Sequence, residues 1–193
     1  MRLGRHRRRG VVRFVAVATA LVLSGCGMFG SSKSSSSSET PAAASAVSCP
    51  SASILKPLSQ TAVFAPGAAH QPLGVGFYGI LSDVTVNCEG SGPGLRATLD
   101  VVVIGERGPA ASGGTGLDLQ YFVAVTGPDQ SILSKRSFPV HIDIPATSRR
   151  GGITDHIEQP IPLAGRSAGD VSIVLGFQQS PEVVDFYRHF RGR

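Results

Sequence analysis

Alternating apolar and polar positions form the clearest pattern in this chain. Segment 75–88 has apolar residues at every other position in its second half, as a half-buried strand requires. The turn-forming stretch 89–94 follows, and segment 95–104 then alternates in the same way. The apolar positions are Val84, Val86 and Cys88 in the first segment, and Leu99, Val101 and Val103 in the second. The pattern predicts a β-hairpin of these two segments.

Further strands are expected on the same grounds. The turn-forming residues 127–130 separate segments 121–125 and 132–144, which predicts a second hairpin. Three shorter strands are expected over 62–64, 157–163 and 171–177. Short strands separated by turn signals predict an antiparallel β-sandwich of immunoglobulin-like general architecture. Residues 49–193 are enough for one such domain and too few for two.

The chain is expected to end in a short helix over residues 181–190. Ser180 suits the N-cap, and Pro181 suits the first helical position. Four apolar residues fall at helical spacing: Val183, Phe186, Tyr187 and Phe190. We expect this face to pack on the sandwich. The alternative is an exposed helix that binds a partner or lies on a membrane surface.

Residues 1–25 have the organisation of a signal peptide. The first 13 residues contain six arginines and no acid, and residues 14–23 are apolar apart from Thr19. The alternative is a transmembrane helix, which requires about 20 apolar residues. This run has about half that number. We therefore expect residues 1–25 to direct export and then to be removed.

The four residues Leu23-Ser24-Gly25-Cys26 resemble the lipobox of bacterial lipoproteins. The resemblance implies that the thiol of Cys26 receives a diacylglyceryl group, that the chain is cut before it, and that the new amine is acylated. Two or three acyl chains hold a protein firmly on a membrane. In Gram-negative lipoproteins of this kind, a residue other than Asp after the cysteine, here Gly27, goes with sorting to the outer membrane. The alternative is a stray cysteine beside an ordinary cleavage site.

Removal of the signal peptide changes the charge of the chain. The whole sequence carries a formal net charge of +5, which by itself suggests binding to nucleic acid or to an anionic membrane. However, six of the 18 Lys and Arg residues lie in the first 13 residues, which leaves 12 against 13 Asp and Glu. The processed chain is therefore close to −1, and we expect no nucleic-acid partner.

The cysteine count agrees with lipidation and export. The chain has three cysteines, and lipidation of Cys26 leaves Cys49 and Cys88 to form a disulfide in an oxidising compartment. The entropy of closing that loop corresponds to about 4 kcal/mol. The alternative is two buried thiols that do not meet. Residues 26–48 are rich in Ser, Ala and Gly, which predicts a flexible tether that reaches about 75 Å when fully stretched.

Few residue patterns point to catalysis or metal binding. Residues 107–116 resemble a phosphate-binding loop only loosely, because they lack the Gly-Lys-Ser/Thr ending. His141 and Asp143 are two apart on an expected strand and so share a face. A second polar cluster comprises Asp155, His156 and Glu158. The two clusters could form a metal site only if their strands were neighbours, and we predict no catalytic residue, no metal site and no cofactor.

Parts of the chain also resemble a group of short bacterial lipoproteins of unknown function. The residues that carry this resemblance are 49–50, 107–110, 121–125 and 176–178. The group has no known activity and so implies no catalytic residue. We expect an outer-membrane lipoprotein that faces the periplasm and binds or scaffolds a protein partner of the cell envelope.

Three other classes of function remain open at this point. An accessory subunit of an envelope transport or assembly machine would affect outer-membrane permeability. A carrier of a small ligand or lipid would have a closed apolar cavity. A hydrolase would have a cleft that joins His141 and Asp143, or His156 and Glu158, to a nucleophile.

Overall fold

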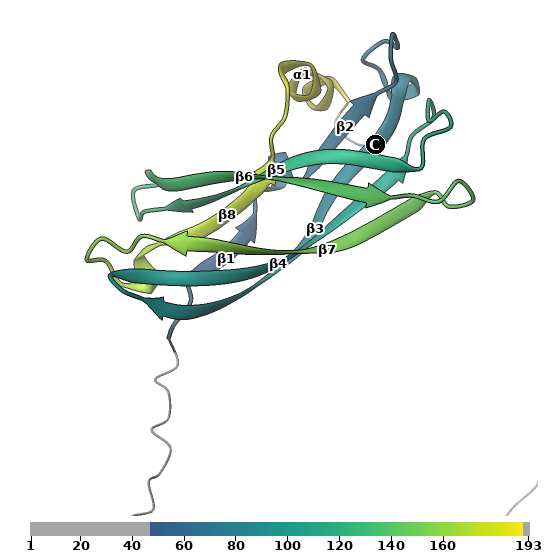
Figure 1. The fold of residues 1–193 in the computed structure, drawn as a ribbon. Helices are drawn as coiled ribbons and strands as arrows, with labels where there is room; N and C mark the ends of the chain where they lie inside the picture. Colours follow the sequence, from purple (N-terminus) through teal and green to yellow (C-terminus); the bar gives the residue numbers. More distant parts are fainter. Residues whose placement is uncertain (1–46, 191–193) are drawn as a thin grey trace, which may run out of the picture. The chain divides into compact units, whose positions relative to one another are not determined.

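The computed structural model describes residues 47–190, which form a sandwich of two four-stranded sheets (Figure 1). The first sheet consists, in spatial order, of β1 (Ser51–Ile54), β8 (Ser172–Phe177), β5 (Gly116–Thr126) and β6 (Ile132–Asp143). The second consists of β2 (Gln60–Phe64), β3 (Val75–Ser91), β4 (Gly94–Arg107) and β7 (Arg150–Ile161). All strand pairs are antiparallel except β1 with β8. The predicted antiparallel sandwich is confirmed.

The hydrophobic core lies between the two sheets. Leu99, Val101 and Val103 of β4 are completely buried, as their alternation predicted. They pack in one cluster with apolar residues of the first sheet, among them Val123 and Ile173. Both predicted hairpins are confirmed, because β3 pairs with β4 and β5 pairs with β6.

A β-bulge divides β3 into two halves. The register of β3 on β4 shifts between Leu81 and Asp83. A bulge inserts one extra residue, so the alternation shifts by one position and the other set of side chains faces the core after it. Leu81 is buried before the bulge, and Val84 and Val86 pack on the same core after it. Before the bulge, Phe77 and Leu81 pack on this core and Tyr78 packs in a separate apolar cluster on the other face, so the alternation is visible only in the second half of the strand.

Two strand segments were not predicted. β1 has only four residues, two of them exposed serines, and its partner β8 lies at the other end of the sequence. β7 was expected over 157–163 but begins at Arg150, and its first half contains Gly151 and Gly152. Both segments lack a run of apolar residues, so pairing with neighbouring strands rather than residue pattern makes them strands.

The predicted disulfide joins Cys49 to Cys88, with 5.4 Å between their Cα atoms. Cys49 comes two residues before β1 of the first sheet, and Cys88 lies in β3 of the second sheet. The bond therefore links the two sheets covalently, at the point where the described part of the chain begins.

The predicted C-terminal helix is α1 (Pro181–His189), which lies on the outer face of the second sheet. A Cβ at Gly79 would contact side chains of the first sheet, so Gly79 faces the core. Its neighbour Tyr78 therefore faces outward, with Ala62 beside it in register. Phe186 of α1 forms a second small core with these residues. Ser180 is at the N-cap but makes no side-chain capping hydrogen bond.

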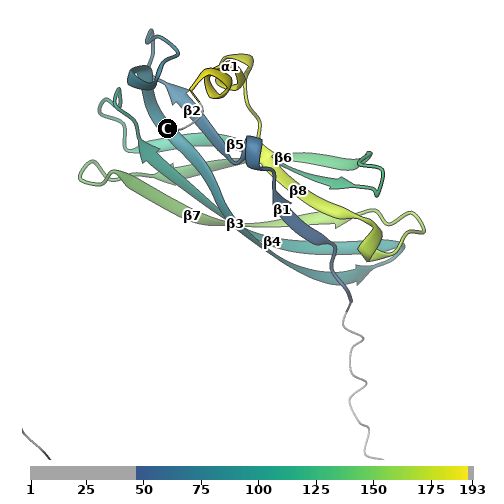
Figure 2. The same cartoon turned by 180° about the vertical axis from the view of Figure 1, so that it is seen from behind.

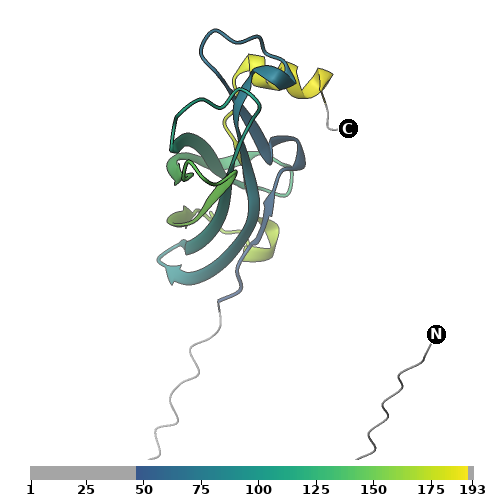
Figure 3. The same ribbon diagram turned by 90° about the vertical axis from the view of Figure 1, so that its right-hand side faces the viewer.

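The described domain has two distinct ends. The segment that precedes β1 lies beside the β3–β4 turn, whereas α1 lies at the opposite end (Figures 1 and 2). The side view in Figure 3 shows the same separation. The predicted signal peptide, Cys26 and almost all of the predicted tether lie outside the described residues. Among residues 47–190, no helix combines the length and hydropathy needed to cross a membrane.

Candidate functional site

An open groove of about 490 Å³ lies between α1, the edge strand β2 and the 3-10 turn η1 (Lys56–Leu58). Its walls are Lys56, Pro57, Leu58, Gln60, Gln179, Val184, Tyr187 and Arg188. Gln179, in the connection from β8 to α1, donates a 2.6 Å hydrogen bond from Nε2 to the carbonyl oxygen of Gln60. This bond fixes the start of α1 against β2 and so helps to shape the groove.

The groove combines an apolar wall with positive charge. Val184, Tyr187 and Arg188 lie three and four residues apart on α1 and therefore share one face of the helix. Leu58 faces them from η1. The only ionisable groups besides Tyr187 on these walls are the two cations Lys56 and Arg188, and within residues 47–190 neither has an ion-pair partner.

The hydroxyl of Tyr187 is buried and has no hydrogen-bond partner among the described residues. Burial raises the pKa of Tyr187 to about 12, and the neighbouring Tyr78 is a smaller cause. The hydroxyl therefore stays protonated and can donate a hydrogen bond at any physiological pH. An unpaired buried donor is costly, since it has lost its water and gained no acceptor.

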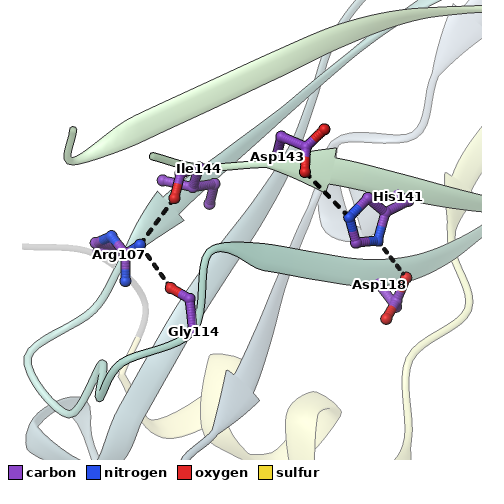
Figure 4. Close-up of polar contacts among 6 residues, drawn as sticks. All are labelled: Arg107, Gly114, Asp118, His141, Asp143 and Ile144. Atoms are coloured by element: carbon purple, nitrogen blue, oxygen red, sulfur yellow. Dashed lines mark hydrogen bonds and ion pairs between the residues drawn. The ribbon is translucent and has the colours of Figure 1, made fainter. Parts of the chain in front are cut away.

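His141 lies between two carboxylates on the first sheet, as Figure 4 shows. Its Nδ1 is 2.7 Å from Oδ1 of Asp118, which is its register partner on β5. Its Nε2 is 3.4 Å from Oδ1 of Asp143, two residues further along β6. The hydrogen bond with Asp118, and then the charges of the two aspartates, raise the pKa of His141 above its usual value. A Cβ at Gly116 would overlap the imidazole, so glycine there leaves room for the ring.

The second predicted polar cluster is divided among different partners. His156 pairs with Asp100 at 2.6 Å, and Glu158 accepts a 2.7 Å hydrogen bond from Arg96. Asp155 instead accepts a 2.8 Å hydrogen bond from the hydroxyl of Tyr121. All three side chains of this cluster are therefore paired with residues of β4 or β5.

The structure does not join the two clusters into one site. His141 lies on β6 of the first sheet, whereas His156 lies on β7 of the second. Each imidazole is paired with an aspartate of its own sheet. Within the described part of the chain, no group of three His, Cys, Asp or Glu side chains is arranged to hold a metal ion.

Arg107 fastens the loop that resembled a phosphate-binding loop. Its guanidinium donates hydrogen bonds to the carbonyl oxygens of Ser148, Gly114 and Ile144, at 3.1, 2.6 and 2.8 Å. Figure 4 shows the last two of these bonds. The guanidinium also lies 5.5 Å from the ring centroid of Phe77. Because its donors face carbonyl groups of the protein, Arg107 holds the loops after β4 and β6 together.

Residues 165–169 read Gly-Arg-Ser-Ala-Gly, so a Gly-x-Ser-x-Gly pattern is present, whereas the prediction of no catalytic residue assumed that the chain has no such elbow. In hydrolases this pattern places a nucleophilic serine on a sharp turn between a strand and a helix. Here Ser167 is the N-cap of the 3-10 turn η3 (Ala168–Asp170), and its hydroxyl donates a 2.7 Å hydrogen bond to Asp170. Among residues 47–190, no histidine is hydrogen-bonded to Ser167. The serine therefore caps a turn.

The groove itself was missed in the sequence. The residue pattern placed Tyr187 on the packing face of the helix and treated Arg188 as a C-terminal cation that complements the helix dipole. Lys56 and Gln60 had no distinguishing pattern. The groove exists because β1 and β8 pair and so bring η1 beside the start of α1, which are far apart in the sequence.

Comparison with known proteins gives no relative: no protein-family model, no curated protein and no solved structure matches this chain.

Proposed function

We propose that this chain is a bacterial lipoprotein, anchored by Cys26 in the outer membrane, whose domain is a non-catalytic binding or scaffolding module that faces the periplasm. The attachment rests on the lipobox-like residues 23–26. The disulfide Cys49–Cys88 agrees with export, because disulfides persist in oxidising compartments.

One observation carries the binding role. The groove beside α1 has an apolar wall and two cations, Lys56 and Arg188, that lack ion-pair partners in the described domain. α1 lies at the end of the domain opposite the segment before β1, to which the proposed tether 26–48 connects (Figure 1). A module attached at one end and equipped for binding at the other can reach a partner while it stays on the membrane.

The geometry supports a binding module better than a carrier or a hydrolase. A lipid carrier encloses its ligand in an apolar cavity, whereas this groove is open and partly charged. A hydrolase needs a nucleophile beside its base. Within the described residues, the ring nitrogens of His141 and His156 form hydrogen bonds with aspartates and not with a nucleophilic side chain. An accessory subunit of an envelope machine is one form of the same binding role.

Mass spectrometry of the amino terminus tests the attachment. The N-terminal peptide of the full chain is expected to begin at Cys26 and to carry a diacylglyceryl group. Cys26→Ser is expected to abolish the modification and release the protein from the outer-membrane fraction, while the nearby control Ser31→Ala changes neither. An unmodified amino terminus, or unchanged fractionation of Cys26→Ser, would contradict the proposal.

Chemical crosslinking of intact envelopes tests the binding role. The wild-type chain is expected to give at least one discrete crosslinked product with an envelope protein. Recovery of the chain alone, under conditions in which a known envelope complex is crosslinked, would contradict the binding role and leave the attachment intact.

A further inference from the structure

We infer that the groove between η1, β2 and α1 binds an acidic peptide segment of a partner protein, with a carboxylate held by Lys56 and Arg188. This inference rests on the proposed binding function and gives it a chemical identity. The groove volume of about 490 Å³ lies in the usual range for binding sites. It accommodates a few residues of an extended chain, and its open form lets the chain continue on both sides.

Charge on the groove walls selects an acidic ligand. Lys56 and Arg188 approach the groove from separate elements, η1 and α1. Within residues 47–190, neither Glu182 nor Asp185 of α1 forms an ion pair with these two cations. A carboxylate between the two cations would gain charge-assisted hydrogen bonds, which are stronger than neutral ones.

The apolar wall favours a peptide segment over a free inorganic anion. Leu58, Pro57 and Val184 lie beside the cations. The amide groups of Gln60 and Gln179 lie on the same walls and can contact a peptide backbone. β2 is an edge strand of the second sheet, and such edges commonly receive extended peptides. The combination of cations, amides and apolar side chains matches an acidic residue flanked by apolar ones.

Calorimetric titration of the full chain with two blocked tetrapeptides tests this inference. One peptide has two glutamates between two leucines, and its twin has glutamines instead. The glutamate peptide is expected to bind about tenfold more tightly than its twin at low ionic strength, and this preference is expected to shrink at high salt. Octanoate serves as a free carboxylate with an apolar chain.

Three variants connect the binding to the groove. Lys56→Gln and Arg188→Gln are each expected to remove most of the preference for glutamate, whereas Arg166→Gln, an exposed arginine outside the groove, leaves it unchanged. Tyr187→Phe is expected to leave the binding of both peptides unchanged, because its hydroxyl is buried away from the groove. Since the hydroxyl has no partner in the free domain, the same variant should unfold at an equal or higher temperature than the wild type.

The outcomes are distinguishable. Equal binding of the two peptides, no binding of either, or equal losses in Arg166→Gln and Arg188→Gln would each overturn the inference. Binding of octanoate without binding of the glutamate peptide would also overturn it, and would make a free carboxylate the occupant. None of these results affects the amino-terminal mass spectrum or the envelope crosslinking, so failure of this inference is separate from failure of the proposed function.

Discussion

Removal of the Cys49–Cys88 disulfide is expected to lower the free energy of unfolding by about 4 kcal/mol. The bond joins residues 39 apart, and the chain-entropy model for a loop of about that length gives about 4 kcal/mol. Both cysteines are only half-buried, so loss of sulfur packing adds about 1 kcal/mol or less. Domains of this size are stable by about 5–15 kcal/mol, and the change therefore matters for folding at growth temperature.

Urea unfolding of the full chain, followed by circular dichroism, measures this effect. The double variant Cys49→Ala/Cys88→Ala is compared with the oxidised wild type, and an expected loss of about 4 kcal/mol corresponds to a fall in Tm of about 8–16 °C. The Ser/Ser double variant is the control for side-chain identity. It should lose the same amount if the closed loop is the cause.

Hydrogen exchange locates the effect within the fold. β1 has four residues and pairs only with β8. Its amides are expected to lose protection in the double variant before those of the β3–β4 hairpin. A loss of stability below about 1 kcal/mol would refute the reasoning from loop entropy. Protection of the β1 amides that falls no earlier than that of the hairpin would refute the local effect on β1.

Three further predictions follow from single contacts. Tyr121→Phe removes a 2.8 Å hydrogen bond to a carboxylate on β7 and should cost about 1.5–3 kcal/mol in urea unfolding; a change below about 0.5 kcal/mol would show that the bond contributes little. NMR titration should give His141 a pKa above 6.5, and Asp118→Asn should lower it. Because the folded pKa is raised, protonated His141 stabilises the domain below the pKa of the unfolded chain, and this contribution is lost as pH rises through the folded pKa; an unchanged pKa in Asp118→Asn would contradict this cause. Gly79→Ala should cost about 1–3 kcal/mol, since its Cβ would lie 2.5 Å from a core leucine, whereas Gly90→Ala meets nothing within 4 Å and should be neutral; equal thermal midpoints would contradict the packing of Gly79.

The sequence was most informative where neighbouring residues pair with one another. β3 and β4 are joined by a short turn, and both alternate clearly, so the hairpin could be predicted with its inward residues. The first half of β3 carries apolar residues on both faces, Leu81 on the main core and Tyr78 beneath α1, which concealed its alternation. The bulge after Leu81 was not predicted either. A bulge adds a residue without changing the residue types, so its position depends on the partner strand.

Features made by residues distant in the sequence could not be predicted. β1 is a strand because it pairs with β8, and its two serines give no apolar signal. The groove has the same origin, since Lys56 and Arg188 come from the two ends of the domain sequence. Neither residue has a local pattern that differs from an ordinary exposed cation. Only the topology brings them to one surface.

The position of the disulfide determines how the domain bears mechanical load. A pull on the chain from its N-terminal side reaches Cys49 first, and Cys49 is bonded directly to β3. The tension therefore passes into the long β3–β4 hairpin and bypasses the four-residue strand β1, which would otherwise be peeled from β8. The domain is thus reinforced where a membrane anchor would strain it.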